Sequence, residues 1–314
     1  MKLLVVGAGA VGSVLAARLS AAGYSVELTA RPEHAAAIRA HGLRIEGTSE
    51  GTFHPVALDA LADAATPDAI VLTVKTFDLS AAASEVGARF GGGIPILLPQ
   101  NGLFVERTVD RALRRTTGED PTPRLVRAVN SIPATLVAPG VVRQAGTPEM
   151  VLRDPSAGGP AATATAVFRD ALERSGIPLR LVRDLDRELW RKALVNAAIN
   201  PVTALHRVTN GRLLESPYRD EAVALLREAQ RAAAAAGYPF SDAEADRDFD
   251  RVVRATAENR SSMLQDRDRG RPTEIEAISG EILGVASAHG LDLPLTRSVV
   301  ERLRATGPLR AESS

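Results

Sequence analysis

The sequence predicts an α/β domain with a parallel sheet, followed by an all-helical domain. Over the first part of the chain, short apolar runs alternate with helical stretches, which is typical of a parallel sheet covered by helices on both faces. From about residue 184 onward the spacing is helical only. The length of 314 residues suits two domains, since a domain holds roughly 100–200 residues. We therefore expect domains at 1–183 and 184–314.

The elements of the first domain are predicted in order along the chain. Apolar runs of strand length occur at Leu3–Gly7, Ser25–Ala30, Ala69–Lys75, Ile94–Pro99, Val126–Ser131, Val141–Gln144, Met150–Arg153 and Pro178–Val182. Helical patterns occur at Val11–Ala22, Arg31–His41, Leu79–Arg89 and Ala161–Ser175. Arg114–Pro123 is polar and contains proline, so we expect a surface loop there.

The second domain is expected to be helical throughout, with Gly or Pro at the breaks. Its predicted helices are Glu188–Asn200, Tyr218–Ala236, Asp242–Arg267, Glu274–His289 and Leu295–Ala305. Thr273 and Glu276 have the spacing of a capping box, which assigns Glu276 to a helix start rather than to chemistry.

Composition excludes several classes of protein. The 38 basic and 38 acidic residues give no electrostatic bias toward nucleic acid or an anionic membrane. No segment reaches the roughly 18 apolar residues of a membrane span, and the chain opens on a strand-like run, so we expect no signal peptide. The absence of cysteine excludes disulfides and thiolate metal sites and fits a cytoplasmic enzyme. The five histidines lack metal-ligand spacing, so no metal site is expected.

Lysine is rare, which makes individual lysines informative. The chain has three lysines, Lys2, Lys75 and Lys192, and hence 35 arginines among its 38 basic residues. Lysine differs from arginine in carrying a compact ammonium that can titrate. Lys2 is terminal, so Lys75 and Lys192 are the candidates for a function that needs such a group.

A glycine-rich motif follows the first predicted strand and opens the first predicted helix. The motif Gly7-Ala8-Gly9-Ala10-Val11-Gly12 has the G-x-G-x-x-G spacing, which in this context is typical of a Rossmann-type dinucleotide site. The glycines allow a tight turn, backbone approach to a pyrophosphate and close helix packing, and the helix N-terminus attracts the phosphates. The alternative is a glycine turn that binds nothing.

The end of the second predicted strand favours NADP(H) over NAD(H). NAD sites usually place a carboxylate there against the ribose 2′-hydroxyl. This strand ends Thr29-Ala30-Arg31, and Glu27 comes too early in it. Arg31 can form a bidentate pair with a 2′-phosphate, although it could instead be an ordinary surface arginine.

A polar row runs along the first helix of the second domain. Lys192, Asn196 and Asn200 recur at intervals of four, so successive members are offset by about 40° around the helix. Such a row among apolar neighbours costs stability unless polar groups lie opposite. Hydrogen bonds between helices are one explanation for the asparagines, but the lysine would still need a carboxylate.

The sequence resembles the ketopantoate reductase (2-dehydropantoate 2-reductase) family nearly end to end. The matching segments are GAGAVG at 7–12, VK at 74–75, QNG at 100–102, ELWRKALVNAAINPVTAL at 188–205 and ENRSSMLQDRDRGRPTEIEAISG at 258–280. The resemblance implies an oxidoreductase that uses NADPH to reduce ketopantoate to pantoate, in pantothenate and coenzyme A biosynthesis.

The resemblance also implies roles for individual residues. It implies substrate contacts for Lys192, Asn196, Asn200, Asn210 and Ser262. Among these, Lys192 is the general acid at the ketone oxygen and Ser262 holds the carboxylate. Without the resemblance, Ser262 would be interpreted as a small helix residue.

On the cofactor side, the resemblance implies contacts for Lys75, Asn101, Ala134 and Glu274, besides Gly7–Gly12 and Arg31. Glu274 is expected where the nicotinamide ribose and the substrate meet, with a catalytic role. Taken alone, Asn101-Gly102 would be interpreted as a turn. We place Asn101 in the first domain and expect the active site in a cleft between the domains.

Two alternatives stay open. A paralogue with the same motifs could reduce another 2-oxo acid. A non-catalytic, NADP(H)-responsive regulator is the second, but sensing a dinucleotide would not require Lys192, Asn196 and Glu274 together. The sequence leaves a homodimer open.

Overall fold

The structure is a computed structural model that describes residues 1–48 and 50–306. Contacts within the chain group it into two units. The first unit comprises Met1–Gln100 and Val105–Leu185, and the second comprises Asn101–Phe104 and Asp186–Ser314. Asn101, which we expected in the first domain, thus belongs to the second unit together with three neighbours.

The first unit is built on a sheet of eight strands in the order β12-β11-β8-β7-β6-β1-β2-β5. All neighbours pair in parallel except β8 and β11, which are antiparallel. The strands are β1 (Lys2–Val6), β2 (Ser25–Thr29), β5 (Val56–Leu58), β6 (Ala69–Leu72), β7 (Ile96–Leu98), β8 (Leu125–Ser131), β11 (Glu149–Arg153) and β12 (Leu179–Val182). The predicted α/β class is therefore confirmed.

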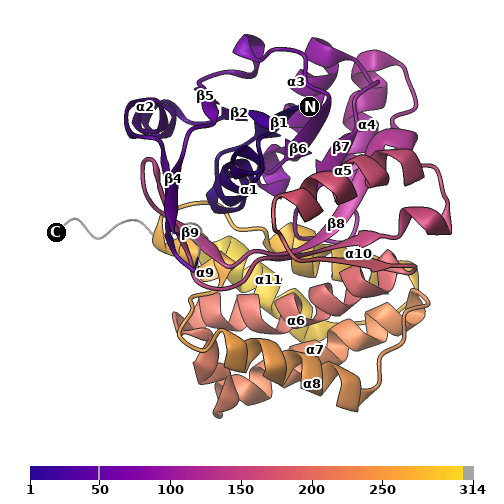
Figure 1. Ribbon diagram of the computed structural model, residues 1–314. Helices are drawn as coiled ribbons and strands as arrows, with labels where there is room; N and C mark the ends of the chain where they lie inside the picture. Colours follow the sequence, from indigo (N-terminus) through magenta and orange to yellow (C-terminus); the bar gives the residue numbers. More distant parts are fainter. Residues whose placement is uncertain (49, 307–314) are drawn as a thin grey trace. The chain divides into compact units, whose positions relative to one another are not determined.

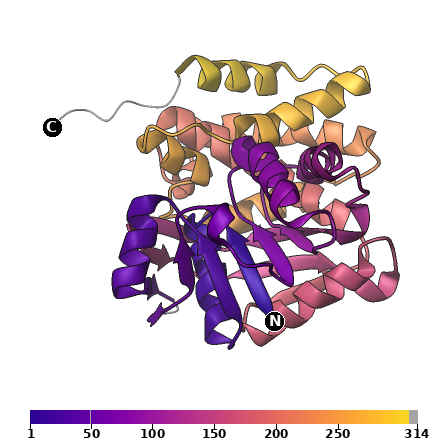
Figure 2. The ribbon, with the colours of Figure 1, turned by 90° about the horizontal axis from the view of Figure 1, so that it is seen from above.

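Strand β1 shows how both faces of this sheet are buried. Leu3 and Val5 contribute to one core, shared with helices α1 (Ala10–Ala21) and α5 (Ala162–Arg174). Leu4 and Val6 contribute to the other, shared with α3 (Leu79–Phe90) and α4 (Val105–Thr117). Alternate side chains of a strand point to opposite faces, and Figure 2 shows α3 and α4 (purple) and α5 (rose) on opposite sides of the strands.

Helix α4 corrects one expectation about the first unit. The predicted surface loop Arg114–Pro123 is wrong over its first residues, because α4 continues to Thr117. The helix is stabilised by a buried apolar stripe at Val105, Val109, Ala112 and Leu113. This stripe has helical spacing, whereas the polar residues of the last turn lie on the exposed side.

A second sheet of four strands, in the order β4-β3-β10-β9, adjoins α1 in the first unit. Its strands are β3 (Leu43–Gly47), β4 (Gly51–Phe53), β9 (Ala134–Ala138) and β10 (Val141–Gln144). Helix α2 (Pro32–His41) leads into β3. Only β10 of these strands was predicted.

The second unit is helical, as predicted. Its helices are α6 (Leu185–His206), a 3-10 helix (Asn210–Leu214), α7 (Tyr218–Ala235), α8 (Asp242–Ala255), α9 (Ser262–Asp268), a π-helix (Glu276–Gly280), α10 (Glu281–Ala288) and α11 (Pro294–Thr306). Helices α6, α7 and α8 lie side by side in Figure 1. Across residues 1–48 and 50–306, no helix combines the length and apolarity needed to cross a bilayer.

Two expectations about these helices are wrong. The single helix predicted over Asp242–Arg267 is interrupted after Ala255, and Ser261 starts α9 by accepting a hydrogen bond from the Leu264 N–H. The capping box is also absent from the described chain. The Glu276 carboxylate instead pairs with Arg304 of α11, whose Nε and Nη2 lie 2.6 and 2.8 Å from its oxygens.

Candidate functional site

The glycine motif is held at the carboxyl ends of the central strands. Gly7 follows β1 with φ of 107°, a conformation that favours glycine. Its N–H donates to Thr29 Oγ1 at 3.1 Å, and its carbonyl accepts from Thr73 Oγ1 at 2.6 Å. Sequence reasoning missed both threonines. Their signal was a hydroxyl residue at the end of each parallel strand beside β1.

The other two glycines of the motif, Gly9 and Gly12, suit the loop to the pyrophosphate of a dinucleotide. A Cβ on Gly12 would overlap Gly7 O and Thr73 Oγ1, so the loop can close on α1 only with glycine there. A Cβ on Gly9 would meet no atom of the described residues within 4 Å. Gly9 is the N-cap of α1, so the space beside it adjoins a helix N-terminus, where phosphate binds favourably. These residues fit a pyrophosphate group.

Arg31 and Glu27 differ in how the fold engages them. Arg31 is the N-cap residue of α2 and is exposed, and its guanidinium makes no hydrogen bond or ion pair within the described part of the chain. Glu27 is half-buried within β2, and its carboxylate accepts the Ala65 N–H at 2.9 Å. Glu27 is thus engaged within the fold, whereas the Arg31 guanidinium is exposed and can reach a ligand.

Two further cofactor candidates also lie in the first unit. Lys75 is half-buried and begins the 3-10 turn that follows β6. Because β6 pairs in parallel with β1, Lys75 lies at the same carboxyl edge of the sheet as the glycine motif. Ala134 opens β9 and packs against the same apolar core as Ala8, Ala10 and Val11 of the motif.

The polar row lies on α6 of the second unit. Asn200 is buried, with 5% of its surface exposed, and Lys192 and Asn196 are half-buried. The intervening residues Ala193, Leu194, Val195, Ala197, Ala198 and Ile199 are buried. The three amide or ammonium groups therefore lie on a helix whose intervening residues are all apolar and buried.

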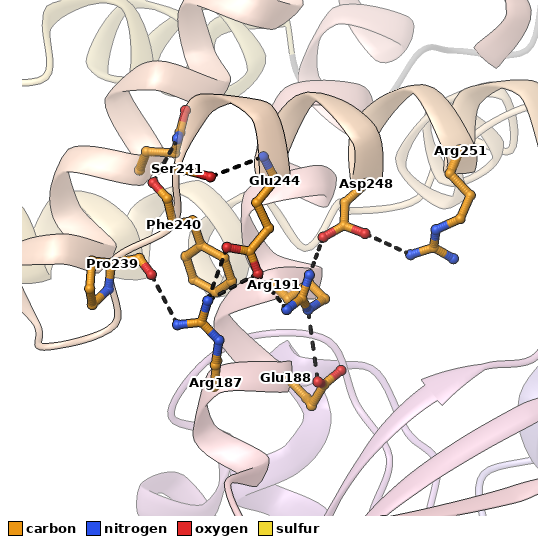
Figure 3. Close-up of polar contacts among 10 residues, drawn as sticks. Arg187, Glu188, Arg191, Pro239, Phe240, Ser241, Glu244, Asp248 and Arg251 are labelled. Atoms are coloured by element: carbon orange, nitrogen blue, oxygen red, sulfur yellow. Dashed lines mark hydrogen bonds and ion pairs between the residues drawn. The ribbon is translucent and has the colours of Figure 1, made fainter.

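Ion pairs hold another side of α6 against α8, as Figure 3 shows. Glu244 accepts from Arg187 Nη2 at 3.0 Å and from Arg191 Nη2 at 2.7 Å, and Arg191 also pairs with Asp248. Burial acts to raise the pKa of Glu244, but the two guanidinium groups outweigh it and lower that pKa. Arg191 is offset from Lys192 by about 100° around the helix, so its ion pairs with α8 lie on a different side of α6 from Lys192.

Asn210 is buried and only partly satisfied. Its N–H donates to Asn259 O at 2.9 Å, and its Nδ2 donates to Thr256 Oγ1 at 2.8 Å. Its buried Oδ1 has no hydrogen-bond partner among the described residues. A buried acceptor without a donor costs free energy, so this oxygen suits a donor supplied by a ligand.

The N-terminus of α9 places Ser262 on the surface. Ser261 rather than Ser262 caps the helix, and Ser261 Oγ lies 2.7 Å from Thr203 Oγ1 of α6. Ser262 is the first residue of α9 and is exposed. The Thr203 contact joins the start of α9 to the helix that carries the polar row.

The structure brings together two candidate residues that are far apart in sequence. Asn101 Nδ2 donates to Glu274 Oε2 at 3.3 Å, and Glu274 is buried with 6% of its surface exposed. The other cofactor candidates, Gly7–Gly12, Arg31, Lys75 and Ala134, belong to the first unit. No group of three or more metal-ligating side chains is found within the described ranges.

Comparison with known proteins identifies relatives over the whole chain. Residues 3–156 match the family "Ketopantoate reductase PanE/ApbA", and residues 184–307 match "Ketopantoate reductase PanE/ApbA C terminal". A 2-dehydropantoate 2-reductase of Archaeoglobus fulgidus is 34% identical over 306 residues, which cover 96% of this chain and 97% of the relative.

Solved structures resemble the chain at similar coverage. A PanE/ApbA family ketopantoate reductase from Ralstonia eutropha JMP134 superposes with a TM-score of 0.84 at 27% identity, covering 97% of this chain and 98% of the other. A D-mandelate dehydrogenase with NADH and anilino(oxo)acetate superposes with a TM-score of 0.86 at 22% identity, covering 97% of each chain.

Proposed function

The chain belongs to the ketopantoate reductase family, and we propose that it reduces ketopantoate to pantoate with NADPH. The observation that carries this proposal is the row of Lys192, Asn196 and Asn200 on α6, because every residue between Lys192 and Asn196 and between Asn196 and Asn200 is apolar and buried. An ammonium beside two neutral amides suits an anionic 2-oxo acid, because the amides can orient it without competing for the proton of the lysine.

When bound, the nicotinamide cofactor would supply the hydride that the ketone carbon receives in the proposed reaction. Lys192 donates a proton to the ketone oxygen, where negative charge would otherwise develop. Asn196, Asn200 and Asn210 hold polar groups of the substrate, and the Asn210 Oδ1 that lacks a donor accepts a substrate hydroxyl. Ser262 holds the substrate carboxylate.

The proposed cofactor residues hold different parts of NADPH. The motif Gly7–Gly12 holds the pyrophosphate at the N-terminus of α1, and Arg31 binds the 2′-phosphate. Lys75, Asn101, Ala134 and Glu274 line the nicotinamide side. NADPH is preferred to NADH because Arg31 is exposed at the N-terminus of α2, whereas Glu27 lies within β2 and accepts a backbone N–H.

A second candidate function is the reduction of another 2-oxo acid by the same residues. D-mandelate dehydrogenase shares the fold and was solved with NADH and anilino(oxo)acetate. The fold therefore accommodates more than one ligand of this class, and the substrate depends on side chains around the polar row.

Steady-state rates with a panel of 2-oxo acids test the proposal. NADPH consumption is followed by absorbance with ketopantoate, pyruvate, 2-oxoisovalerate and phenylglyoxylate, and each is repeated with NADH. We expect the highest kcat/KM with ketopantoate and NADPH. A higher value for another acid would support the second candidate, and no turnover with any of them would refute both.

A further inference from the structure

Glu281 binds the backbone of the loop that joins β7 to α4. This loop, Asn101–Phe104, belongs to the second unit. Glu281 Oε2 accepts the Leu103 N–H and, at 3.3 Å, the Phe104 N–H. Hydrogen bonds to a charged carboxylate are stronger than those between neutral groups. One carboxylate oxygen therefore holds two consecutive peptide groups of the loop.

The loop also lies in close contact with the helical segment before Glu281. Gly102 has φ of 100°, and a Cβ there would lie 2.8 Å from Ala277 O and 3.2 Å from Glu281 Oε2. No side chain other than hydrogen fits at this position without a shift of the backbone. The peptide of Gly102 is therefore confined between Ala277 and Glu281.

These contacts form a series that ends at the proposed active-site pair. Glu281 holds residues 103 and 104, Ala277 confines Gly102, and Glu274 accepts the amide of Asn101. Glu274 and Glu281 are seven residues apart and flank the π-helix Glu276–Gly280. Successive residues of the loop therefore contact successive residues of the helical segment, in the same order along the chain.

We propose that Glu281 is a positioning residue for the reaction. By fixing the backbone of Leu103 and Phe104, it sets the position of the Asn101 amide against the Glu274 carboxylate. The inference rests on the proposed function, in which Asn101 and Glu274 contact the nicotinamide side of the cofactor. A small displacement of such groups lowers the rate, because reaction requires closely defined geometry.

Substitutions at Glu281 and a matched control test this role. We expect Glu281→Ala to lower kcat/KM about tenfold or more, since two hydrogen bonds to a charged group are lost. Glu281→Gln keeps an acceptor oxygen and should recover part of the loss. The control is Glu276→Gln on the same helical segment, whose carboxylate binds the exposed Arg304 and whose substitution should leave kcat/KM unchanged.

A double-substitution cycle separates positioning from general stabilisation. If Glu281 acts through Asn101, then Asn101→Ala with Glu281→Ala should lose no more activity than Asn101→Ala alone. Losses that multiply, or a Glu281→Ala enzyme with unchanged kcat/KM, would overturn the inference. A fall in Tm without a change in kcat/KM would reduce Glu281 to a structural contact.

Failure of the proposed function and failure of the inference on Glu281 give different results. Absence of turnover by the unaltered chain with every 2-oxo acid would refute the proposed function, whereas normal turnover combined with an inert Glu281→Ala substitution would refute this inference alone. Both Glu281 variants are compared by thermal unfolding, so that Glu281→Gln provides the test if Glu281→Ala does not fold.

Discussion

Lys192 combines a transferable proton with a place on a helix that is fixed on another side by ion pairs. General acid catalysis contributes about 10²- to 10⁴-fold. We therefore expect Lys192→Ala to lower kcat at least about 100-fold while NADPH affinity is kept. Lys192→Arg should recover only part of the rate, because a guanidinium releases its proton reluctantly. Retention of most of the kcat in folded Lys192→Ala would show that another group is the acid.

Arg31 should determine the choice of cofactor. The loss of a charge-assisted hydrogen bond costs about 1.5–3 kcal/mol, so Arg31→Ala should weaken NADPH binding roughly 10- to 150-fold and leave NADH binding nearly unchanged. Dissociation constants for both cofactors, measured by fluorescence titration, provide the test. The control is Arg39→Ala, since Arg39 lies on helix α2 and pairs with Asp59. Equal losses for NADPH and NADH would contradict a contact with the 2′-phosphate.

At the scale of elements, His34 joins three parts of the first unit. From α2, its Nδ1 accepts the Gly140 N–H at 2.7 Å, and its Nε2 lies 3.3 Å from Ser13 Oγ of α1. An Nδ1 that accepts a hydrogen bond requires the neutral imidazole. Burial lowers the pKa of His34 below 6.5, which also favours the neutral form in the folded protein.

This geometry predicts a pH dependence of stability. In the unfolded chain His34 takes up a proton near its ordinary pKa of about 6.5, whereas in the folded chain it does so only at lower pH. The contribution of His34 is therefore fully present above about pH 6.5 and falls as the pH drops toward the folded-state pKa. Urea unfolding from pH 5 to 8 should show a smaller pH slope for His34→Gln than for the unaltered chain. The exposed His41→Gln substitution on the same helix is the control, and equal slopes in all three would contradict the prediction.

An element could be predicted where its own residues form an apolar run or a periodic apolar pattern. Strands β1 and β6 are apolar and buried along nearly their whole length, so their runs were evident in the sequence. Strands β4 and β5 have three residues each, which is too short for a periodic pattern. The break between α8 and α9 depends on carbonyls of Ala257 and Asn259 that accept N–H groups from a distant segment, and no local pattern records such a contact.

In the candidate site, too, local sequence motifs were predictable, whereas contacts between distant segments were not. The glycine motif and the row on α6 are local patterns, and both were found in the sequence. Thr29, Thr73 and Glu281 gain their contacts only when distant segments meet. The pairing of Asn101 with Glu274 spans 173 positions, so it too required the structure.

At the scale of the whole molecule, the second unit is not a continuous piece of chain. It includes Asn101–Phe104, although the remainder begins at Asp186. A fragment of residues 184–314 would keep the ion pairs between α6 and α8, since all their members lie within it. It would lose the two N–H groups that bind Glu281.

We therefore expect the fragment 184–314 to be loosened locally. Amide hydrogens of Glu276–Gly280 and the first turn of α10 should exchange about tenfold faster or more than in the full chain, because contacts to a charged carboxylate are missing. Amides of α8 should exchange at similar rates in both, which makes them the internal control. Gly102→Val in the full chain should loosen the same amides, since its side chain cannot fit against Ala277. Full protection of Glu276–Gly280 in both the fragment and Gly102→Val would show that these helices are complete without the loop, whereas selective loss there would show that a four-residue segment from the first half of the chain completes the second unit.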